Sequence, residues 1–252
     1  MLWADRPPLD RFDAAAAAGF THVEMLFPQT LPGEQLKEKL QSKGLQMALF
    51  DFYAGDWEAG ERGLAALPDR IEEFRTHWTT DLELASRLGT RTMTVLAGIR
   101  PLGADPLALD QILIDNLRAL AELAVPMGIT LALEAINNTD VPGFHVRTVG
   151  HAATVVEAVG MGNVGIQLDQ YHVAREYEDP IAHLEAHLER IAHVQIADSP
   201  GRHEPGTGTA PIKRFLDRLD ELGYQGRVGL EYVPSGDTDA SLSWLSRAAR
   251  RP

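Results

Sequence analysis

Four oxygen-bearing side chains in the second half of the chain have the types and the spacing of a metal-dependent catalytic site. Glu134, Asp169, Gln195 and Glu231 each end a short apolar run, and intervals of 35, 26 and 36 residues separate them. One strand–helix–strand crossover takes about 30 residues. The spacing therefore predicts four successive parallel strands that deliver four polar groups to one end of a sheet.

Such a group of side chains predicts a bound cation. Three carboxylates and an amide oxygen crowded together would repel one another unless a cation held them. Ligand sets made only of oxygen favour Mg²⁺ or Mn²⁺ over Zn²⁺. We therefore expect a divalent metal, Mg²⁺ or Mn²⁺, at this site. The alternative is that single members of the set cap strands or pair with Lys and Arg in loops.

The residues that precede these four predict a closed barrel. Successive strand side chains alternate between the two faces of a sheet. On the face of the four polar residues, the earlier positions are small or polar: Thr130, Ala132, Gly165, Gln167, His193 and Gly229. The other face is apolar: Leu131, Leu133, Ile166, Leu168, Val194, Ile196, Val228, Leu230 and Tyr232. The apolar face should meet helices and the polar face should line a narrow interior, whereas an open sheet covered by helices would be apolar on both faces.

The rest of the chain alternates between strand and helix patterns. The predicted strands are Thr21–Phe27, Leu45–Phe52, Arg91–Leu96, Ile129–Ile136, Val164–Leu168, His193–Ala197 and Arg227–Tyr232. The predicted helices are Asp10–Ala18, Gly33–Lys43, Pro68–Leu88, Asp105–Val125, Thr148–Val159, Pro180–Ile191, Pro211–Leu222 and Ala240–Ala249. A Gly-rich loop should cover Tyr53–Leu67. This alternation predicts an α/β fold, a (β/α)8 TIM barrel, as a single domain over residues 1–252.

The first strand of that barrel is expected to be truncated. Met1–Trp3 would be its stump, and three residues are too few for a stave of about 5 or more. We favour native residues upstream of Met1 over the alternative, a barrel that closes poorly between its first and last strands.

Composition excludes several classes of protein. A length of 252 residues with 44% hydrophobic composition suits one core. The absence of cysteine excludes disulfides, thiolate metal sites and cysteine nucleophiles, and it suits a cytoplasmic location. The sequence contains no apolar span of about 20 residues, the length that would predict a membrane segment. A net charge of −13 disfavours nucleic acid as a partner. A small-molecule substrate is the expected partner, and a homo-oligomer is compatible with the sequence.

Several motifs spread over nearly the whole chain share a family pattern. They are Ala54–Gly63, Leu133-Glu134-Ala135-Ile136-Asn137, Asp140–Phe144, Gln167-Leu168-Asp169-Gln170-Tyr171-His172, His193–Ala197, Arg202–Gly208 and Gly229-Leu230-Glu231-Tyr232. Together they resemble the hydroxypyruvate isomerase group of the xylose-isomerase-like barrels. Two positions depart from the pattern: Ala135 stands where proline is expected, and Asp51 stands where His or Asn is common.

The resemblance implies a metal held by Glu134, Asp169, Gln195 and Glu231, with Glu134 and Glu231 also acting as the catalytic proton-transfer pair. The implied reaction interconverts hydroxypyruvate and tartronate semialdehyde through an enediolate. This chemistry needs a base at one carbon, an acid at the next, and stabilisation of an oxyanion. No redox cofactor is expected.

Three further residues are expected to bind the substrate, and each has a plainer interpretation. His172 would reach it from the loop after the strand that ends at Asp169, or would only pack that loop. Arg202 would bind a carboxylate with its two-pronged guanidinium, or would be solvated. Glu204 would belong to a lid or to a surface turn. Glu24 either points into the barrel mouth or is buried with a basic partner.

Other functions stay open at this point. Within enzymes, they are isomerisation of 2-oxo-tetronate and 3-epimerisation of a ketose. A catalytically silent barrel that binds a metal or a sugar is a further alternative, although both glutamates are present. A barrel endonuclease is disfavoured by the acidic charge.

Overall fold

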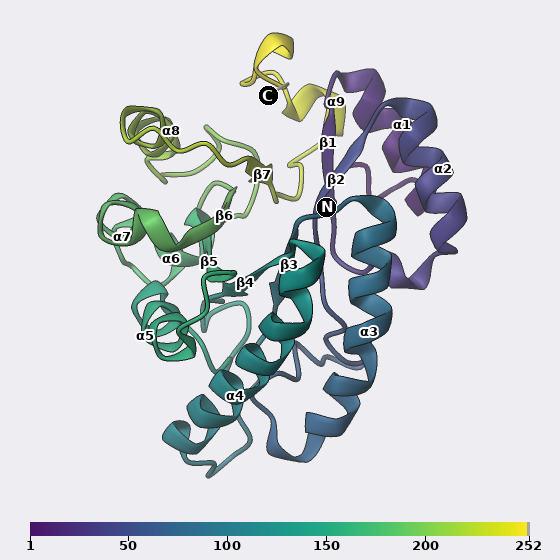
Figure 1. Cartoon of the computed structure of the whole chain (residues 1–252). Helices are drawn as coiled ribbons and strands as arrows, with labels where there is room; N and C mark the ends of the chain where they lie inside the picture. The colour runs from purple at the N-terminus through teal and green to yellow at the C-terminus, as the bar shows by residue number, and fades with distance from the viewer. Residues whose placement is uncertain (251–252) are drawn as a thin grey trace.

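Seven parallel strands form a nearly closed barrel with the helices outside it (Figure 1). The computed structural model describes residues 1–250. Each strand pairs with the next one in the chain, in the order β1 to β7. The strands are β1 His22–Met25, β2 Gln46–Asp51, β3 Thr92–Val95, β4 Thr130–Glu134, β5 Val164–Asp169, β6 Ile191–Ile196 and β7 Val228–Leu230. The seven predicted strands and the TIM barrel class are confirmed.

The helices follow the strands as predicted, with two differences. They are α1 Pro8–Ala18, α2 Gly33–Lys43, α3 Ile71–Leu88, α4 Pro106–Ala124, α5 Val149–Val159, α6 Gln170–Arg175, α7 Pro180–His187, α8 Ile212–Glu221 and α9 Thr238–Ser241. The short helix α6 was not predicted. The single helix predicted over Ala240–Ala249 is wrong, because the segment divides into α9 and a 3-10 turn, Arg247–Arg250. Three serines in 241–246 offer side-chain hydrogen bonds that compete with a continuous helix.

Local chemistry sets the helix ends. The side chains of Asp105, Thr148 and Asp179 accept hydrogen bonds from backbone N–H groups in the first turns of α4, α5 and α7. At the other end of α3, Gly89 has the left-handed conformation that glycine adopts readily. These caps explain why α4, α5 and α7 begin, and why α3 ends, where they do.

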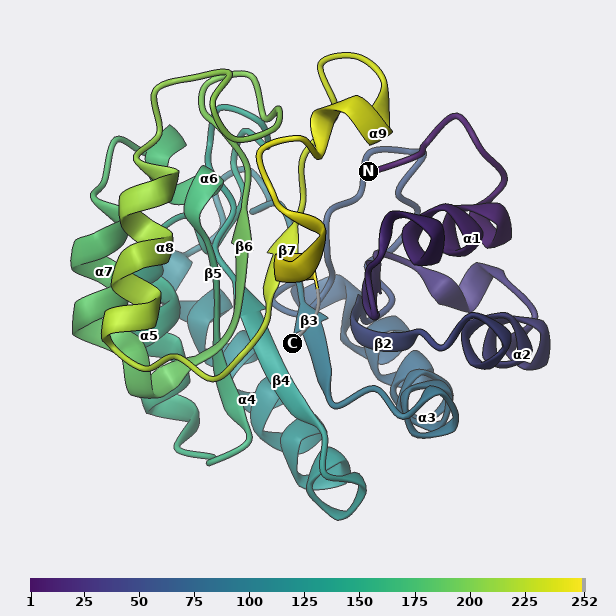
Figure 2. The same ribbon diagram turned by 90° about the horizontal axis from the view of Figure 1, so that it is seen from above.

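The edges of the sheet, β1 and β7, face each other across a seam, and α9 lies beside it (Figure 2). Met1–Trp3 is not a strand stump, so that prediction is wrong. Trp3 has a left-handed φ of 50°, its backbone N–H donates to Thr238 Oγ1 at 3.2 Å, and its ring N–H donates to Asp239 Oδ1 at 3.1 Å. These hydrogen bonds hold the start of the chain against α9 rather than in the sheet.

A chain of polar side chains crosses the barrel interior. The Thr94 hydroxyl donates to Gln167 Oε1 at 2.7 Å, and Gln167 Nε2 donates to Gln195 Oε1 at 2.6 Å. Gln195 Nε2 then donates to Glu24 Oε2 at 3.0 Å, and Glu24 Oε1 lies 2.6 Å from His193 Nε2. The polar face therefore lines the interior as predicted. Both interpretations of Glu24 hold, since its side chain points inward and has His193 as a basic partner.

Candidate active site

The four predicted metal ligands lie at the C-terminal ends of the last four strands, where the active sites of such barrels form. Glu134 and Asp169 are the final residues of β4 and β5, Gln195 is next to last in β6, and Glu231 follows β7 directly. The strand register pairs Asp169 with Gln195, whereas Glu134 pairs with Gln167. The four ligands therefore occupy staggered levels, as the tilt of barrel strands requires.

Glu134 and Asp169 converge with His172 into one buried group. Each of these three residues offers one ligand atom, and the three atoms lie within 4.8 Å of one another. His172 Nε2 is 3.5 Å from Asp169 Oδ2 and 3.9 Å from Glu134 Oε1. His172 lies on α6 and not in a loop as predicted. Asp169 Oδ1 caps this helix by accepting from the Tyr171 N–H at 2.8 Å, which turns His172 back toward the carboxylates.

Asn137 holds the other side of the His172 ring. Its side-chain nitrogen lies 2.6 Å from His172 Nδ1, and its backbone N–H donates to the same atom at 3.4 Å. Burial, and then Arg202, lower the pKa of His172 well below its usual value. The imidazole is therefore in its neutral form near pH 7. The β4–α5 loop thus contributes a positioning residue that the sequence did not reveal.

Arg202 places its guanidinium among the carboxylates. Its Nη2 lies 2.7 Å from Glu231 Oε2, 3.5 Å from Asp169 Oδ2 and 3.4 Å from His172 Nε2. The guanidinium also lies 5.0 Å from the centre of the Tyr171 ring, within range of a cation–π interaction. Arg202 is therefore part of the carboxylate cluster and not a solvated loop residue, and its role in substrate binding stays a prediction.

The electrostatics of the cluster favour protonated carboxyl groups. Burial raises the pKa of Glu134 well above its usual value, and the neighbouring Glu231 and Asp169 raise it further. Burial also raises the pKa of Asp169 to about 7, although Arg202 opposes the shift. Carboxyl groups whose pKa is raised in this way stay ionised only if an additional positive charge lies nearby.

Asp51 is a fourth acidic member that we did not assign to the site from the sequence. It is the last residue of β2 and is buried. Burial, and then Glu231, raise the pKa of Asp51 well above its usual value. Asp51 also raises the pKa of Glu134. The sequence signal for Asp51 is the same as for the four predicted ligands: a polar residue at the end of an apolar strand.

The residues present fit a divalent cation. Within residues 1–250, Asp169 Oδ2 and Arg202 Nε are buried and have no hydrogen-bond partner. The amide oxygen of Gln195 accepts from Gln167 and keeps a second lone pair. Carboxylate and amide oxygens are ligands for Mg²⁺ and Mn²⁺.

Glu204 joins two loops beside the site. Its carboxylate accepts from the Ser235 N–H at 2.9 Å and from the Ser235 hydroxyl. Glu204 belongs to the β6–α8 loop, and Ser235 belongs to the segment after β7. This position suits either a lid or a surface turn, and the role of Glu204 in substrate binding stays a prediction.

A cavity of about 760 Å³ runs along the seam between β1 and β7. Its walls include Trp3, Phe20, Met25, Trp57 and Leu230. In the part of the chain that the structure describes, the four predicted ligands do not line this cavity. The seam cavity is therefore distinct from the predicted metal site at the strand ends.

Comparisons with known proteins agree with this fold. Residues 12–248 match the model of the xylose isomerase-like TIM barrel family. The chain is 39% identical over 245 residues to 2-oxo-tetronate isomerase from Cupriavidus necator, covering 97% of the chain and 94% of the relative. It is 38% identical to hydroxypyruvate isomerase from Escherichia coli, covering 97% of the chain and 95% of the relative.

A solved structure shares both fold and sequence. The crystal structure of AP endonuclease, family 2, from Brucella melitensis superposes with a TM-score of 0.93 and 37% identity, covering 96% of this chain and 94% of that one. The relatives named as isomerases span nearly the whole chain, which supports an isomerase. The chain belongs to the xylose isomerase-like TIM barrel family, in the group that includes hydroxypyruvate isomerase and 2-oxo-tetronate isomerase.

Proposed function

We propose that the chain is a metal-dependent isomerase that interconverts hydroxypyruvate and tartronate semialdehyde. One observation carries the proposal: Glu134 and Glu231, from non-adjacent strands, lie in one buried cluster with Asp169 and Arg202. The cluster combines two carboxyl groups in different environments with a cation suited to a substrate carboxylate.

The reaction moves a proton from C3 of hydroxypyruvate to C2 through an enediolate, and the C3 hydroxyl proton passes to the oxygen at C2. Glu231 Oε2 accepts a charge-assisted hydrogen bond from Arg202, and we assign Glu231 as the base at C3. Glu134, at the end of the non-adjacent strand β4, is assigned as the acid that protonates C2. In the reverse direction the two glutamates exchange roles.

The remaining residues position the substrate. Arg202 Nε–H is buried without a partner among residues 1–250, and it is the donor we assign to the substrate carboxylate. His172, held by Asn137, would face a substrate oxygen with Nε2. A divalent cation bound by Glu134, Asp169, Gln195 and Glu231 would stabilise the negative oxygen that develops during the reaction.

The test is isomerisation of hydroxypyruvate by metal-stripped protein, with and without added Mg²⁺ or Mn²⁺, followed by NMR. We expect metal-dependent formation of tartronate semialdehyde. Glu231→Gln should lower kcat by about 100-fold or more, since general acid–base groups contribute about 10²–10⁴. Glu122→Gln, an exposed site on α4, is the matched control and should retain parental turnover.

Two results would redirect the proposal. Turnover by Glu231→Gln within about tenfold of the parent would refute the two-glutamate mechanism. If instead 2-oxo-tetronate or a free ketose is converted faster than hydroxypyruvate, the site is retained and the substrate changes. The relatives named 2-oxo-tetronate isomerase make that acid the first alternative to assay.

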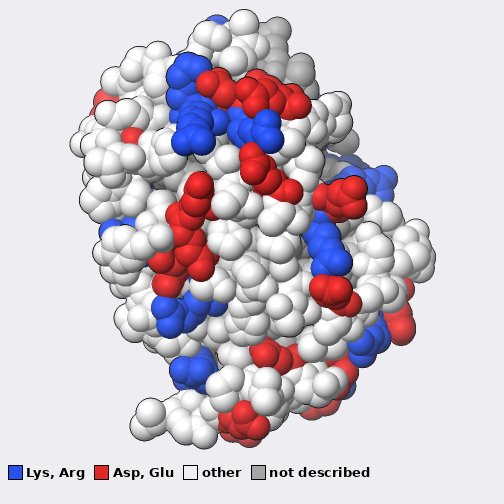
Figure 3. Space-filling model, turned by 90° about the vertical axis from the view of Figure 1, so that its left-hand side faces the viewer, with Lys and Arg blue, Asp and Glu red and all other residues white. Residues whose placement is uncertain are grey.

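An endonuclease activity has weaker support, although one related structure carries that name. Binding of a phosphate backbone needs clustered positive charge. Over α5, α7 and α8, basic and acidic side chains alternate (Figure 3). Arg218 there pairs with Glu185 and Glu221. This face resembles an ordinary solvated surface.

A further inference from the structure

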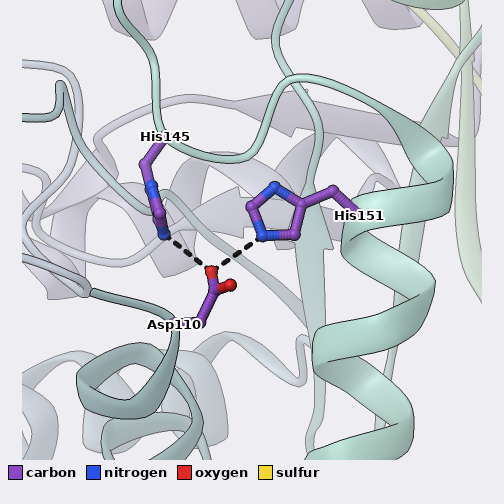
Figure 4. Close-up of side chains that lie close together, drawn as sticks. All are labelled: Asp110, His145 and His151. Atoms are coloured by element: carbon purple, nitrogen blue, oxygen red, sulfur yellow. Dashed lines mark hydrogen bonds and ion pairs between the residues drawn. The ribbon is translucent and has the colours of Figure 1, made fainter. Parts of the chain in front are cut away.

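Three side chains outside the barrel interior converge on one point, and none of them takes part in the proposed reaction (Figure 4). Asp110 comes from α4, His145 from the β4–α5 loop, and His151 from the first turn of α5. Asp110 Oδ1 lies 2.8 Å from His145 Nε2 and 2.7 Å from His151 Nε2. The two rings thus direct the same nitrogen toward the same carboxylate oxygen.

The distances fit a small tetrahedral ion. One ligand atom from each residue lies within 4.8 Å of the other two. Around tetrahedral Zn²⁺, with bonds of about 2.0–2.1 Å, ligand atoms lie about 3.3 Å apart. The nitrogens and the oxygen would therefore separate by only about half an ångström to admit the ion. The side chain of His145 is 2% exposed, so its ring is already fixed in place, while Asp110 and His151 are about a quarter exposed and leave a path for entry.

The charge state of the cluster is also suitable. Metals bind the neutral imidazole. Burial lowers the pKa of His145, although Asp110 opposes this shift, so the ring is neutral near pH 7. His151 and Arg100 also lower the pKa of His145. Arg100 places a positive charge near His145, and the Asp110 carboxylate acts on the pKa of His145 in the opposite direction.

We propose that Asp110, His145 and His151 form a second metal site, separate from the candidate active site, which binds Zn²⁺ with water in the fourth position. Two imidazoles and one carboxylate are a ligand set that zinc accepts, whereas Mg²⁺ prefers oxygen alone. The rival interpretation is a purely structural network, in which Asp110 links α4 to α5 through two hydrogen bonds.

A metal at this site would fasten the loop that supports the active site. The β4–α5 loop begins near Asn137, which holds His172, and reaches His145 eight residues later. Zinc would join this loop to α4 and α5 at once. The site does not depend on the proposed isomerase activity.

The test is titration of metal-stripped protein with Co²⁺, which substitutes for zinc and reports geometry by its visible spectrum. A four-coordinate site with nitrogen ligands absorbs strongly, whereas a six-coordinate site of oxygen ligands absorbs weakly. We expect a strong band whose full amplitude corresponds to one bound Co²⁺ per chain and that Zn²⁺ abolishes by competition. The band should persist in Asp169→Asn, which impairs the candidate active site only.

His151→Gln is the decisive variant, because glutamine can still donate a hydrogen bond to Asp110 but is a poor zinc ligand. We expect it to lose the band while its melting temperature without metal stays close to that of the parent. His183→Gln is the matched control: His183 pairs with Glu178 at 2.8 Å, stands four residues from His187 on α7, and should keep the band.

Three results would overturn the proposal. The first is a parent protein with no strong cobalt band. The second is a band that His151→Gln retains, and the third is a band that His183→Gln loses. If His151→Gln fails to fold, Asp110→Asn replaces it, since asparagine keeps one acceptor oxygen for the histidines and removes the charge that zinc needs.

Discussion

Arg202 is the residue on which the charge balance of the candidate site depends. It lies within 3.5 Å of oxygens from both Glu231 and Asp169, and its Nε remains without a partner among the described residues. A hydrogen bond to a charged group contributes about 1.5–3 kcal/mol. We therefore expect Arg202→Gln to raise the KM for hydroxypyruvate by about 10- to 100-fold, because the substrate carboxylate loses its charged partner.

Steady-state kinetics on two substrates make this prediction specific. The KM for a neutral ketose, if the enzyme converts one, should change much less than the KM for hydroxypyruvate. Arg147→Gln is the control, since Arg147 is about half exposed and pairs with Glu176 rather than with a residue of the candidate site. An unchanged KM for hydroxypyruvate in Arg202→Gln would remove Arg202 from carboxylate recognition.

At the scale of elements, the Gly-rich loop between β2 and α3 is held against the end of β3. The Gly63 N–H donates to the Ala54 carbonyl at 2.9 Å, and the Ala66 N–H donates to the Ala97 carbonyl at 2.9 Å. Gly63 has a φ of 110°, and a Cβ there would lie 2.4 Å from the Leu96 carbonyl oxygen. Only glycine fits this position without movement of the backbone.

Two glycines of this loop form a matched pair for a stability test. Gly60 has a φ of 94° but open space where a Cβ would lie, so Gly60→Ala should lower the free energy of unfolding by about 1–2 kcal/mol through backbone strain alone. Gly63→Ala adds a clash with backbone and should cost about 1–3 kcal/mol more. Urea denaturation measures both variants. Equal losses would mean that the loop does not pack on β3 in this way.

At the scale of the whole molecule, the buried acidic cluster couples stability to pH and to metal. Burial raises the pKa of Asp169 from 3.8 to about 7. Between these values the folded state retains a proton that the unfolded chain has released, so the contribution of Asp169 to stability falls as pH rises from about 4 to about 7. Buried histidines with lowered pKa values, such as His172, act in the opposite direction over part of this range.

A comparison of the parent with Asp169→Asn isolates the contribution of the Asp169 carboxyl group to the pH dependence of stability. Relative to Asp169→Asn, the metal-stripped parent should lose stability on the order of 1–3 kcal/mol between pH 5 and pH 7. Saturating Mg²⁺ or Mn²⁺ should restore the parent more than the variant, because a ligand bound only by the folded state stabilises it. Urea denaturation at several pH values measures this. Parallel pH profiles for the two proteins would contradict a raised pKa at Asp169.

No helix in residues 1–250 is both long and apolar enough to cross a bilayer.

The seam between β1 and β7 is bridged by contacts between the two ends of the described chain. Arg247 and Arg250 donate to the carbonyls of Ala17 and Ala18 at 2.8 Å. Together with the hydrogen bonds of Trp3, they join the first helix to the last segment.

The sequence by itself determined the barrel class, its seven strands and the strand ends that carry Glu134, Asp169, Gln195 and Glu231. These features depend on local patterns, since alternation along a strand, a cap and a crossover length each need only neighbouring residues. Asp51 also ends an apolar strand, but one acid in that position does not by itself indicate a site.

Only the tertiary structure decided which side chains meet. The stagger of the strands sets the levels of the four predicted ligands, the capped helix α6 turns His172 toward Asp169, and the β6–α8 loop brings Arg202 to Glu231. Asp110, His145 and His151 likewise converge from three separate segments. Such proximity is the sum of several crossovers and register choices, and no local pattern in the chain encodes it.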